Sequence, residues 1–117
     1  MTRSPLLAAG ALNGALAVGA GAFATHGLKD RLSQHALEVF ETAARYQMYH
    51  ALAMILCALL MARTAGWIFQ VGIVLFSGSL YALALTDVKV LGAITPFGGV
   101  AFLAGWGYLV WSAARKR

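Results

Sequence analysis

Side chains that could carry chemistry gather on one helical stripe near the middle of the chain. Glu38, Glu41, Arg45 and Tyr49 recur at intervals of three or four residues, the spacing that places them on one face of a helix. Glu41 precedes Arg45 by four residues, the order that favours an ion pair. Near a membrane boundary such a group could serve as a proton or ion relay. The alternative, which the position near a helix end favours, is a salt-bridge clasp to a neighbouring loop.

One turn further along, His50 shares its face with Tyr46 and, more obliquely, with Gln47. A histidine inside a membrane can titrate near neutral pH. It can equally stay neutral and hydrogen-bond across helices to a serine or asparagine, which is the more frequent case. The spacing of His26, His35 and His50 does not resemble a metal site, so we expect neither a metal nor another cofactor.

Recognisable catalytic patterns are absent. The sequence has no nucleophile elbow, no phosphate-binding loop and no CxxC pair. It has only four acidic residues, and none falls in the middle of an apolar segment. Cys57 is the single cysteine, which excludes an internal disulfide. We therefore expect a protein with no catalytic residues that is not an enzyme.

The composition identifies the environment of these side chains. Of 117 residues, 61% are hydrophobic and 11% are charged, whereas soluble domains have roughly 45–50% and about 25%. A chain of this size could not cover so much apolar surface with so few polar residues, and disorder is excluded for the same reason. The formal net charge is +5, but its only basic run, Arg115 to Arg117, follows an apolar segment. That run is typical of an anchor to anionic lipid, and we expect the lipid bilayer as partner and no nucleic acid.

Four apolar segments are long enough to cross a bilayer, at residues 5–25, 46–62, 67–85 and 96–113. They predict an all-α fold, a single four-span membrane bundle over residues 1–117. The first segment could be a signal peptide, but its length favours a retained span.

The connections differ in length. Residues 63–66 predict a tight hairpin, and Thr95 followed by Pro96 predicts the start of the last helix. Ser33 is a plausible N-cap, and nothing breaks a helix between Gln34 and Gly66. We therefore expect an amphipathic extension over residues 34–45 that packs on the end of the bundle or lies at the interface.

Small residues form stripes along three of the segments. They predict close helix packing inside the bundle or, alternatively, the interface of a homo-oligomer. The residues are Gly10, Gly14 and Gly21 in the first segment, Gly72 and Ser79 in the third, and Gly98 and Gly105 in the fourth. Asn13, Ser77 and Ser79 could add hydrogen bonds between helices.

Four spans place both termini on one side of the membrane. That side would carry Arg3, Arg63, Arg115, Lys116 and Arg117. The other would carry Lys29, Arg31, Arg45 and Lys89. Because cytoplasmic loops are enriched in Lys and Arg, this distribution predicts a multi-pass protein of the bacterial inner membrane with cytoplasmic termini.

Several segments together resemble a known family. Residues 21–28 read GAFATHGL, similar to the GAFGAHGL signature of the YgdD/YwdK-like small inner-membrane proteins, with Ala24-Thr25 in place of Gly-Ala. The similarity continues over residues 36–42, 45–52, 76–81, 92–99 and 105–106. This is a family of unknown function with animal transmembrane relatives. The resemblance implies a four-span membrane protein and no particular activity.

The signature residues indicate where to look for a site. They comprise His26, Glu38, Glu41, Arg45, Tyr46, Gln47, Tyr49 and His50, with Ser77 and Tyr81 one turn apart in the third span. Three hypotheses follow. The first is a non-enzymatic structural or accessory protein. The second is a small transporter or channel for a proton, ion or metabolite, with a water-filled cavity lined by Arg45, Tyr49, His50 and Ser77. The third is a protein that binds a lipid or hydrophobic ligand between its helices.

Overall fold

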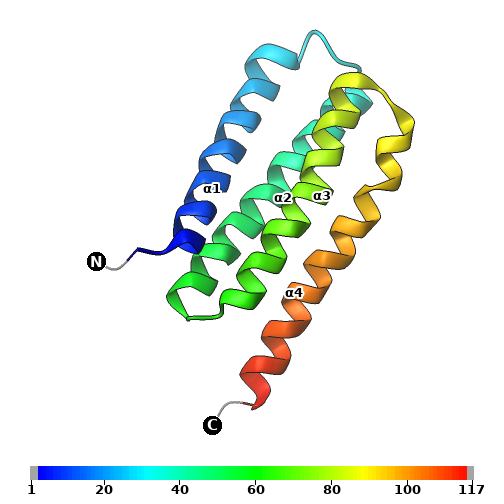
Figure 1. Ribbon diagram of the computed structural model, residues 1–117. Coiled ribbons are helices and arrows are strands. Elements are labelled where there is room, and N and C mark those ends of the chain that lie inside the picture. The colour runs from blue at the N-terminus through cyan, green and yellow to red at the C-terminus, as the bar shows by residue number, and fades with distance from the viewer. Residues whose placement is uncertain (1–2, 116–117) are drawn as a thin grey trace.

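The computed structural model describes residues 3–115, and these residues form four α-helices and no strand (Figure 1). This confirms the predicted all-α fold. The elements are α1 (Pro5–Phe23), the π-helical turn η1 (Ala24–Leu28), α2 (Gln34–Leu59), α3 (Arg63–Thr86), the 3-10 turn η2 (Lys89–Ala93) and α4 (Thr95–Arg115). The predicted extension and the second apolar segment thus belong to one continuous helix, α2. Lys116 and Arg117, part of the predicted lipid anchor, lie outside the described residues.

Serine caps begin the first two long helices. The Ser4 hydroxyl accepts a hydrogen bond from the Leu7 amide at 3.1 Å, with Pro5 in the first turn. The Ser33 hydroxyl accepts one from the Ala36 amide at 3.1 Å, as expected for the predicted cap. Each cap satisfies an amide that the helix itself cannot pair.

The turn between α2 and α3 occupies residues 60–62, so the predicted hairpin at 63–66 was placed too late. Met61 has a positive φ of 63°, and the Ala62 amide donates to the Cys57 carbonyl at 2.8 Å. A left-handed residue with this bond is a common way to end a helix. A glycine would be the usual signal for that conformation, and here a methionine adopts it.

The start of α4 also differs from the prediction. Thr95 is the first residue of the helix, and its hydroxyl lies 2.6 Å from the hydroxyl of Ser79 on α3. This side chain links two helices, which confirms the interhelical bond expected of Ser79.

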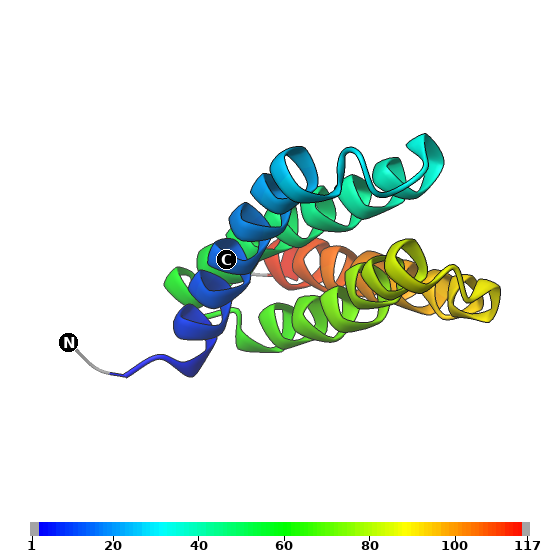
Figure 2. The same ribbon diagram turned by 90° about the horizontal axis from the view of Figure 1, so that it is seen from above.

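The helices pack in the order of the sequence, each antiparallel to the one before. Here α2 lies between α1 and α3, α3 packs on α4, and α1 does not pack on α4 (Figures 1 and 2). The molecule measures 52 × 31 × 17 Å along its principal axes. It is therefore a thin, open bundle in which α1 and α3 meet only slightly and leave part of α2 uncovered.

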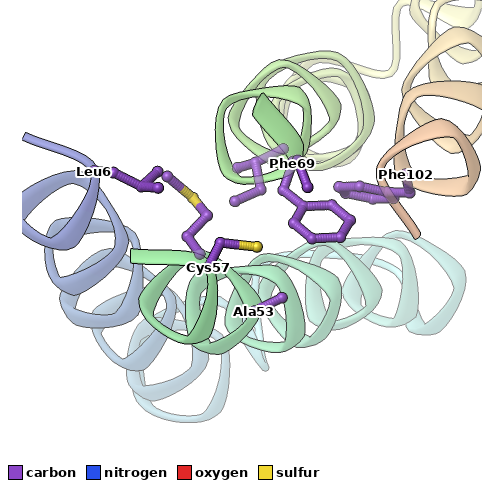
Figure 3. Packing of buried hydrophobic residues seen from close by; sticks show 8 residues of the cluster. Leu6, Ala53, Cys57, Phe69 and Phe102 are labelled. Atoms are coloured by element: carbon purple, nitrogen blue, oxygen red, sulfur yellow. The ribbon is translucent and has the colours of Figure 1, made fainter. Parts of the chain in front are cut away.

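Two apolar clusters hold the bundle together. The larger joins all four helices around Phe69 and Met54, both fully buried, and Figure 3 shows Phe69 between Phe102 of α4 and the α2 residues Ala53 and Cys57. The smaller lies at the opposite end, where Phe40 packs with Ala24, Leu28 and Ala84. The first turns of α2 therefore pack against the ends of α1 and α3.

Most of the predicted small-residue positions lie at helix contacts. A Cβ on Gly72 or Gly105 would overlap Phe102 or Phe69, and one on Gly98 would overlap the backbone of Phe76. Gly10 faces α2 closely, whereas a Cβ on Gly14 would only just touch Ala51 at 4.0 Å. Gly21 is different, because a Cβ there would meet nothing within 4 Å. The prediction that Gly21 packs against another helix of this chain is wrong.

Among the described residues, three helical segments are long and apolar enough to span a membrane: Pro5–Leu28, Arg63–Thr86 and Lys89–Arg115. α2 is not one of them, because its first half carries charged and amide side chains. Its passage through the membrane stays a prediction, supported by its antiparallel packing between α1 and α3.

Candidate functional site

Amide side chains from three helices form a continuous hydrogen-bonded chain inside the bundle. The Tyr81 hydroxyl donates to Gln47 Oε1 at 2.7 Å, and Gln47 Nε2 donates to Asn13 Oδ1 at 3.0 Å. Asn13 Nδ2 in turn donates to Gln70 Oε1 at 2.8 Å. Asn13 and Gln47 are buried, while Tyr81 and Gln70 are half-buried. We call these four residues the amide chain.

A backbone carbonyl fixes the direction of the amide chain. Asn13 Nδ2 also donates to the Ala9 carbonyl at 2.9 Å, and only the NH₂ group can face a carbonyl. Asn13 therefore offers its oxygen to Gln47 and its nitrogen to Gln70. It follows that Gln70 accepts through its oxygen, and that Tyr81 must be the donor at the other end.

Gln70 is left with an unused donor group. Its Nε2 meets no acceptor among the described residues, although its Oε1 is paired. No fully buried side-chain nitrogen or oxygen in the described part of the chain lacks a partner, so this NH₂ group lies where another molecule can reach it. Asn13 was noted from the sequence as a hydrogen-bonding residue, but Gln70 was missed. The signal was available, since glutamine is rare within an apolar run of membrane length.

The amide chain lies along a groove between α1 and α3, with α2 beneath. The groove has a volume of about 780 Å³ and mostly apolar walls. Its described lining residues are Leu12, Asn13, Ala15, Leu16, Gly19, Ala20, Phe23, Phe40, Gln47, Gln70, Ile73, Val74, Ser77, Gly78, Tyr81 and Leu85. None of these side chains is charged. All four residues of the amide chain line the groove, and so does Ser77, whose hydroxyl donates to the Ala43 carbonyl at 2.7 Å.

His50 faces away from this groove, toward α4. Its Nδ1 lies 2.8 Å from the Tyr46 carbonyl, and its Nε2 accepts from Trp106 Nε1 at 3.1 Å. The ring stacks on Phe102 with centroids 3.6 Å apart and an interplanar angle of 7°. Both ring nitrogens are therefore occupied inside an aromatic cluster that joins α2 to α4. The bond across helices was expected, but its partner is a tryptophan.

The charged stripe lies elsewhere on α2. Arg45 and Tyr49 are exposed and Glu41 is half-buried, and they border a separate hollow against α1 of about 420 Å³. The predicted ion pair between Glu41 and Arg45 does not form, since the only salt bridge within residues 3–115 joins Asp87 to Lys89. An exposed pair gains little from closing, because water screens the charges and holding two long side chains costs entropy.

Two further charged sites lie near the end of the bundle where α3 finishes. Glu38 is exposed, and its Oε2 accepts a hydrogen bond from Gln34 Nε2 at 3.3 Å. Asp87 and Lys89 are 80% and 81% exposed, with 2.8 Å between the carboxylate and the ammonium. The hydrogen bond from Lys89, helped by its positive charge, holds the pKa of Asp87 below its usual range. His26 is exposed on η1 and has no hydrogen bond to the other described residues.

Most of the sequence-predicted polar residues therefore fall into three groups, two of which touch, because the ring centroids of Tyr46 and Tyr49 are 5.5 Å apart. Gln47, Ser77 and Tyr81 line the large groove, while Tyr46 and His50 belong to the aromatic cluster. Glu41, Arg45 and Tyr49 border the smaller hollow, with Glu38 and His26 exposed apart from it. The four residues expected to line a transport cavity are thus distributed over all three groups.

The fold and the apolar helices define a helical membrane protein. Residues 20–99 match the family described as protein of unknown function DUF423. The chain is 47% identical to the UPF0382 membrane protein YwdK of Bacillus subtilis, over 91% of this chain and 93% of the relative. It is 53% identical to a UPF0382 membrane protein of Staphylococcus epidermidis and 51% identical to one of Staphylococcus aureus, each over 86% of this chain and 88% of the relative.

The chain therefore belongs to this DUF423 family of membrane proteins, which confirms the resemblance to YwdK-like proteins. No solved structure matches it.

Proposed function

We propose that the protein is a non-enzymatic membrane protein that holds an amphiphilic molecule, with a long apolar chain, in the groove between α1 and α3. The observation that supports this is the combination of mostly apolar walls with one line of hydrogen-bonding side chains along the groove. Sites for hydrophobic ligands generally combine a large apolar surface with a few placed polar groups. The charged stripe on α2 serves as solvated surface in this proposal.

The dimensions suit a single extended chain. On α3 the lining residues extend from Gln70 to Leu85, and the fifteen steps between these two residues rise about 22 Å along the helix. Half of the hydrocarbon core of a bilayer is about 15 Å thick. The lining is longer than one half of the core and shorter than the whole core of about 30 Å. An apolar chain that lies along it, parallel to the helices, would therefore pass the middle of the bilayer and remain inside the membrane. We place the protein in the bacterial inner membrane, with the groove open to lipid.

Open glycines on both walls allow the groove to be filled without disturbing the packing. A Cβ on Gly19 of α1 or on Gly78 of α3 would meet nothing within 4 Å. We expect Gly78→Leu and Gly19→Leu to fold and to lose at least most of the amphiphile that copurifies with the wild type. Native mass spectrometry from detergent, followed by lipid extraction, measures this loss.

Gly107→Leu is the matched control. Gly107 is an exposed helical glycine on α4, outside the groove, and a Cβ there also meets nothing within 4 Å. This variant makes the same chemical change and should retain the amphiphile. Equal retention by Gly78→Leu and Gly107→Leu would contradict the proposal. If the wild type is dimeric and holds no amphiphile, and Gly78→Leu is monomeric, a second copy of the chain covers the groove instead.

A further inference from the structure

The unused donor of Gln70 indicates what kind of amphiphile the groove takes. An amide NH₂ group that faces hydrocarbon without a partner costs several kcal/mol, so membrane proteins pair such groups. Gln70 Nε2 cannot turn to the amide chain, because the Ala9 carbonyl fixes Asn13 as the donor to Gln70 Oε1. The missing partner must therefore be a hydrogen-bond acceptor from outside the described chain.

The acceptor is expected to be neutral. None of the described side chains that line the groove is charged. An ionised carboxylate or phosphate held at Gln70 would lack a counter-charge there, and desolvating it would cost far more than a single amide donor returns. A carbonyl oxygen of an ester avoids this cost and accepts a hydrogen bond well.

The position of Gln70 favours an ester of a membrane lipid. Gln70 follows the start of α3 by seven residues, about 10 Å along the helix. Helical side chains lean toward the N-terminus of their helix, so the amide group reaches back toward the membrane surface. α3 has 24 residues and is about 36 Å long, slightly more than the roughly 30 Å hydrocarbon core. With α3 centred on that core, the Cα of Gln70 lies about 7 Å inside its edge, and the side chain reaches back from there toward the ester groups of lipids.

The rest of the groove accommodates the chain attached to that ester. From Gln70 the lining continues past Val74, Gly78 and Tyr81 to Leu85, away from the start of α3. A lipid whose ester carbonyl meets Gln70 would thus place its acyl chain along these residues, toward the middle of the bilayer and beyond. Gln70 Nε2 and the apolar part of the groove thus follow one another in the same order as the ester and the acyl chain of a lipid.

From these observations we infer that Gln70 is the residue that selects the ligand, by donating a hydrogen bond from Nε2 to the ester carbonyl of an acyl lipid whose chain fills the groove. This inference rests on the proposed function, because it requires that the groove holds an amphiphile. It adds the chemical class of the polar group, a neutral ester carbonyl, and the residue that recognises it.

The test compares two probes of equal chain length, a long-chain methyl ester and the straight alkane with the same number of carbons. Both are added in equal amounts to the delipidated full-length protein in detergent, and native mass spectrometry gives the ratio of ester-bound to alkane-bound protein. Gln70→Met keeps the length of the side chain and removes its donors. We expect the ester-to-alkane ratio to be about tenfold higher for the wild type than for Gln70→Met, the factor that one net hydrogen bond supplies. Because both proteins face the same micelles, differences in partitioning cancel.

The outcomes separate the two proposals. If both probes bind the wild type and Gly78→Leu excludes both, but the ratio is the same in wild type and Gln70→Met, the ester inference is overturned while the groove proposal stands. If neither probe binds the wild type, or Gly78→Leu binds them as well as the wild type does, the proposed function itself fails. A thermal denaturation curve for Gln70→Met checks that the variant is folded. Should it not be, an ester-to-alkane ratio no higher in the wild type than in empty micelles would still overturn the inference.

Discussion

At the scale of single residues, the Ala9 carbonyl determines the orientation of four side chains on three helices. Only the NH₂ group of Asn13 can face it, and the orientations of Gln47, Gln70 and Tyr81 follow in turn. Bonds of this kind are worth about 1 kcal/mol each between membrane helices, so their main effect is on geometry. The amide chain fixes which atom of Gln70 reaches the groove, and thereby what the groove can recognise.

The same logic assigns the tautomer of His50. Trp106 can only donate, so Nε2 must carry the lone pair, and the Tyr46 carbonyl can only accept, so Nδ1 must carry the proton. We predict that ¹⁵N NMR of labelled histidine in lipid shows, for His50, a protonated Nδ1 and an unprotonated Nε2 at neutral pH.

Trp106→Phe provides the comparison for this prediction. It removes the donor while keeping an aromatic ring at the position, so the Nε2 signal of His50 should move toward that of a non-hydrogen-bonded imidazole. The exposed His26 serves as an internal reference, and its signals should not change. A protonated Nε2 in the wild type, or an unchanged Nε2 signal in Trp106→Phe, would contradict the assignment.

At the scale of elements, α2 combines contacts to the other three helices with polar side chains on its inner faces. It contacts α1 and α3 along its length, and its aromatic cluster reaches α4. Its polar side chains on the inner faces, Gln47 and His50, are all hydrogen-bonded within the protein. Hydrogen bonding within the protein lets Gln47 and His50 lie inside the bundle. Other polar side chains of α2, such as Glu38 and Arg45, are exposed, and both groups make α2 less apolar than the other three helices.

Adjacent glycines at the start of α4 allow a test of the seam between α3 and α4. A Cβ at Gly98 would overlap the backbone of Phe76, which cannot move aside as a side chain can, whereas one at Gly99 meets nothing within 4 Å. We predict that Gly98→Ala lowers the free energy of unfolding by about 2 kcal/mol, because α4 must shift away from α3. Gly99→Ala should instead be neutral or raise it by up to about 1 kcal/mol, because alanine favours the helix.

Unfolding of the purified protein by SDS in mixed micelles, followed by circular dichroism, measures both variants. Since the two substitutions are chemically identical and one residue apart, any general effect on the membrane segment is shared. Equal stabilities for Gly98→Ala and Gly99→Ala would show that α4 does not approach the backbone of Phe76 closely enough to exclude a Cβ at Gly98.

Most elements could be predicted from the sequence, because spans of membrane length and serine caps are local signals. Ser33 was predicted as a cap and does cap α2, whereas the cap of α1, Ser4, was not singled out from the sequence. The α2–α3 turn was misplaced because Met61 adopts a left-handed conformation that its residue type does not announce. The site was harder, because which face of α2 each polar residue occupies depends on its neighbours. Only the packed bundle separates Gln47 from His50 and brings Gln70 to Asn13.

At the scale of the whole molecule, charge is distributed unevenly between the two ends of the bundle. The start of α1, the α2–α3 turn and the end of α4 lie at one end (Figure 1). That end carries Arg3, Arg63 and Arg115 and no acidic residue. All four acidic residues, Asp30, Glu38, Glu41 and Asp87, lie toward the other end of the bundle, after η1, in the first turns of α2 and after α3. Their negative charges offset the basic residues at that end, Lys29, Arg31, Arg45 and Lys89. The net positive charge of the chain is therefore concentrated at the end with the termini.

This asymmetry predicts the orientation in the membrane. Segments rich in Lys and Arg stay in the cytoplasm, so we expect the termini and the α2–α3 turn inside the cell and the η2 connection outside.

Cysteine labelling tests this orientation. Cys57 is only 1% exposed and is replaced by alanine to give a background without cysteine. Single cysteines are then introduced as Thr64→Cys in the first turn of α3 and Val90→Cys in η2, both at exposed positions. A membrane-impermeant maleimide applied to intact cells or spheroplasts should label Val90→Cys and leave Thr64→Cys unlabelled. After permeabilisation both should react, which shows that each cysteine is accessible. The reverse pattern in intact cells would place the termini outside, and with them the Gln70 end of the groove. Labelling of both variants in intact cells, with permeabilisation making no difference, would show that α3 does not cross the membrane.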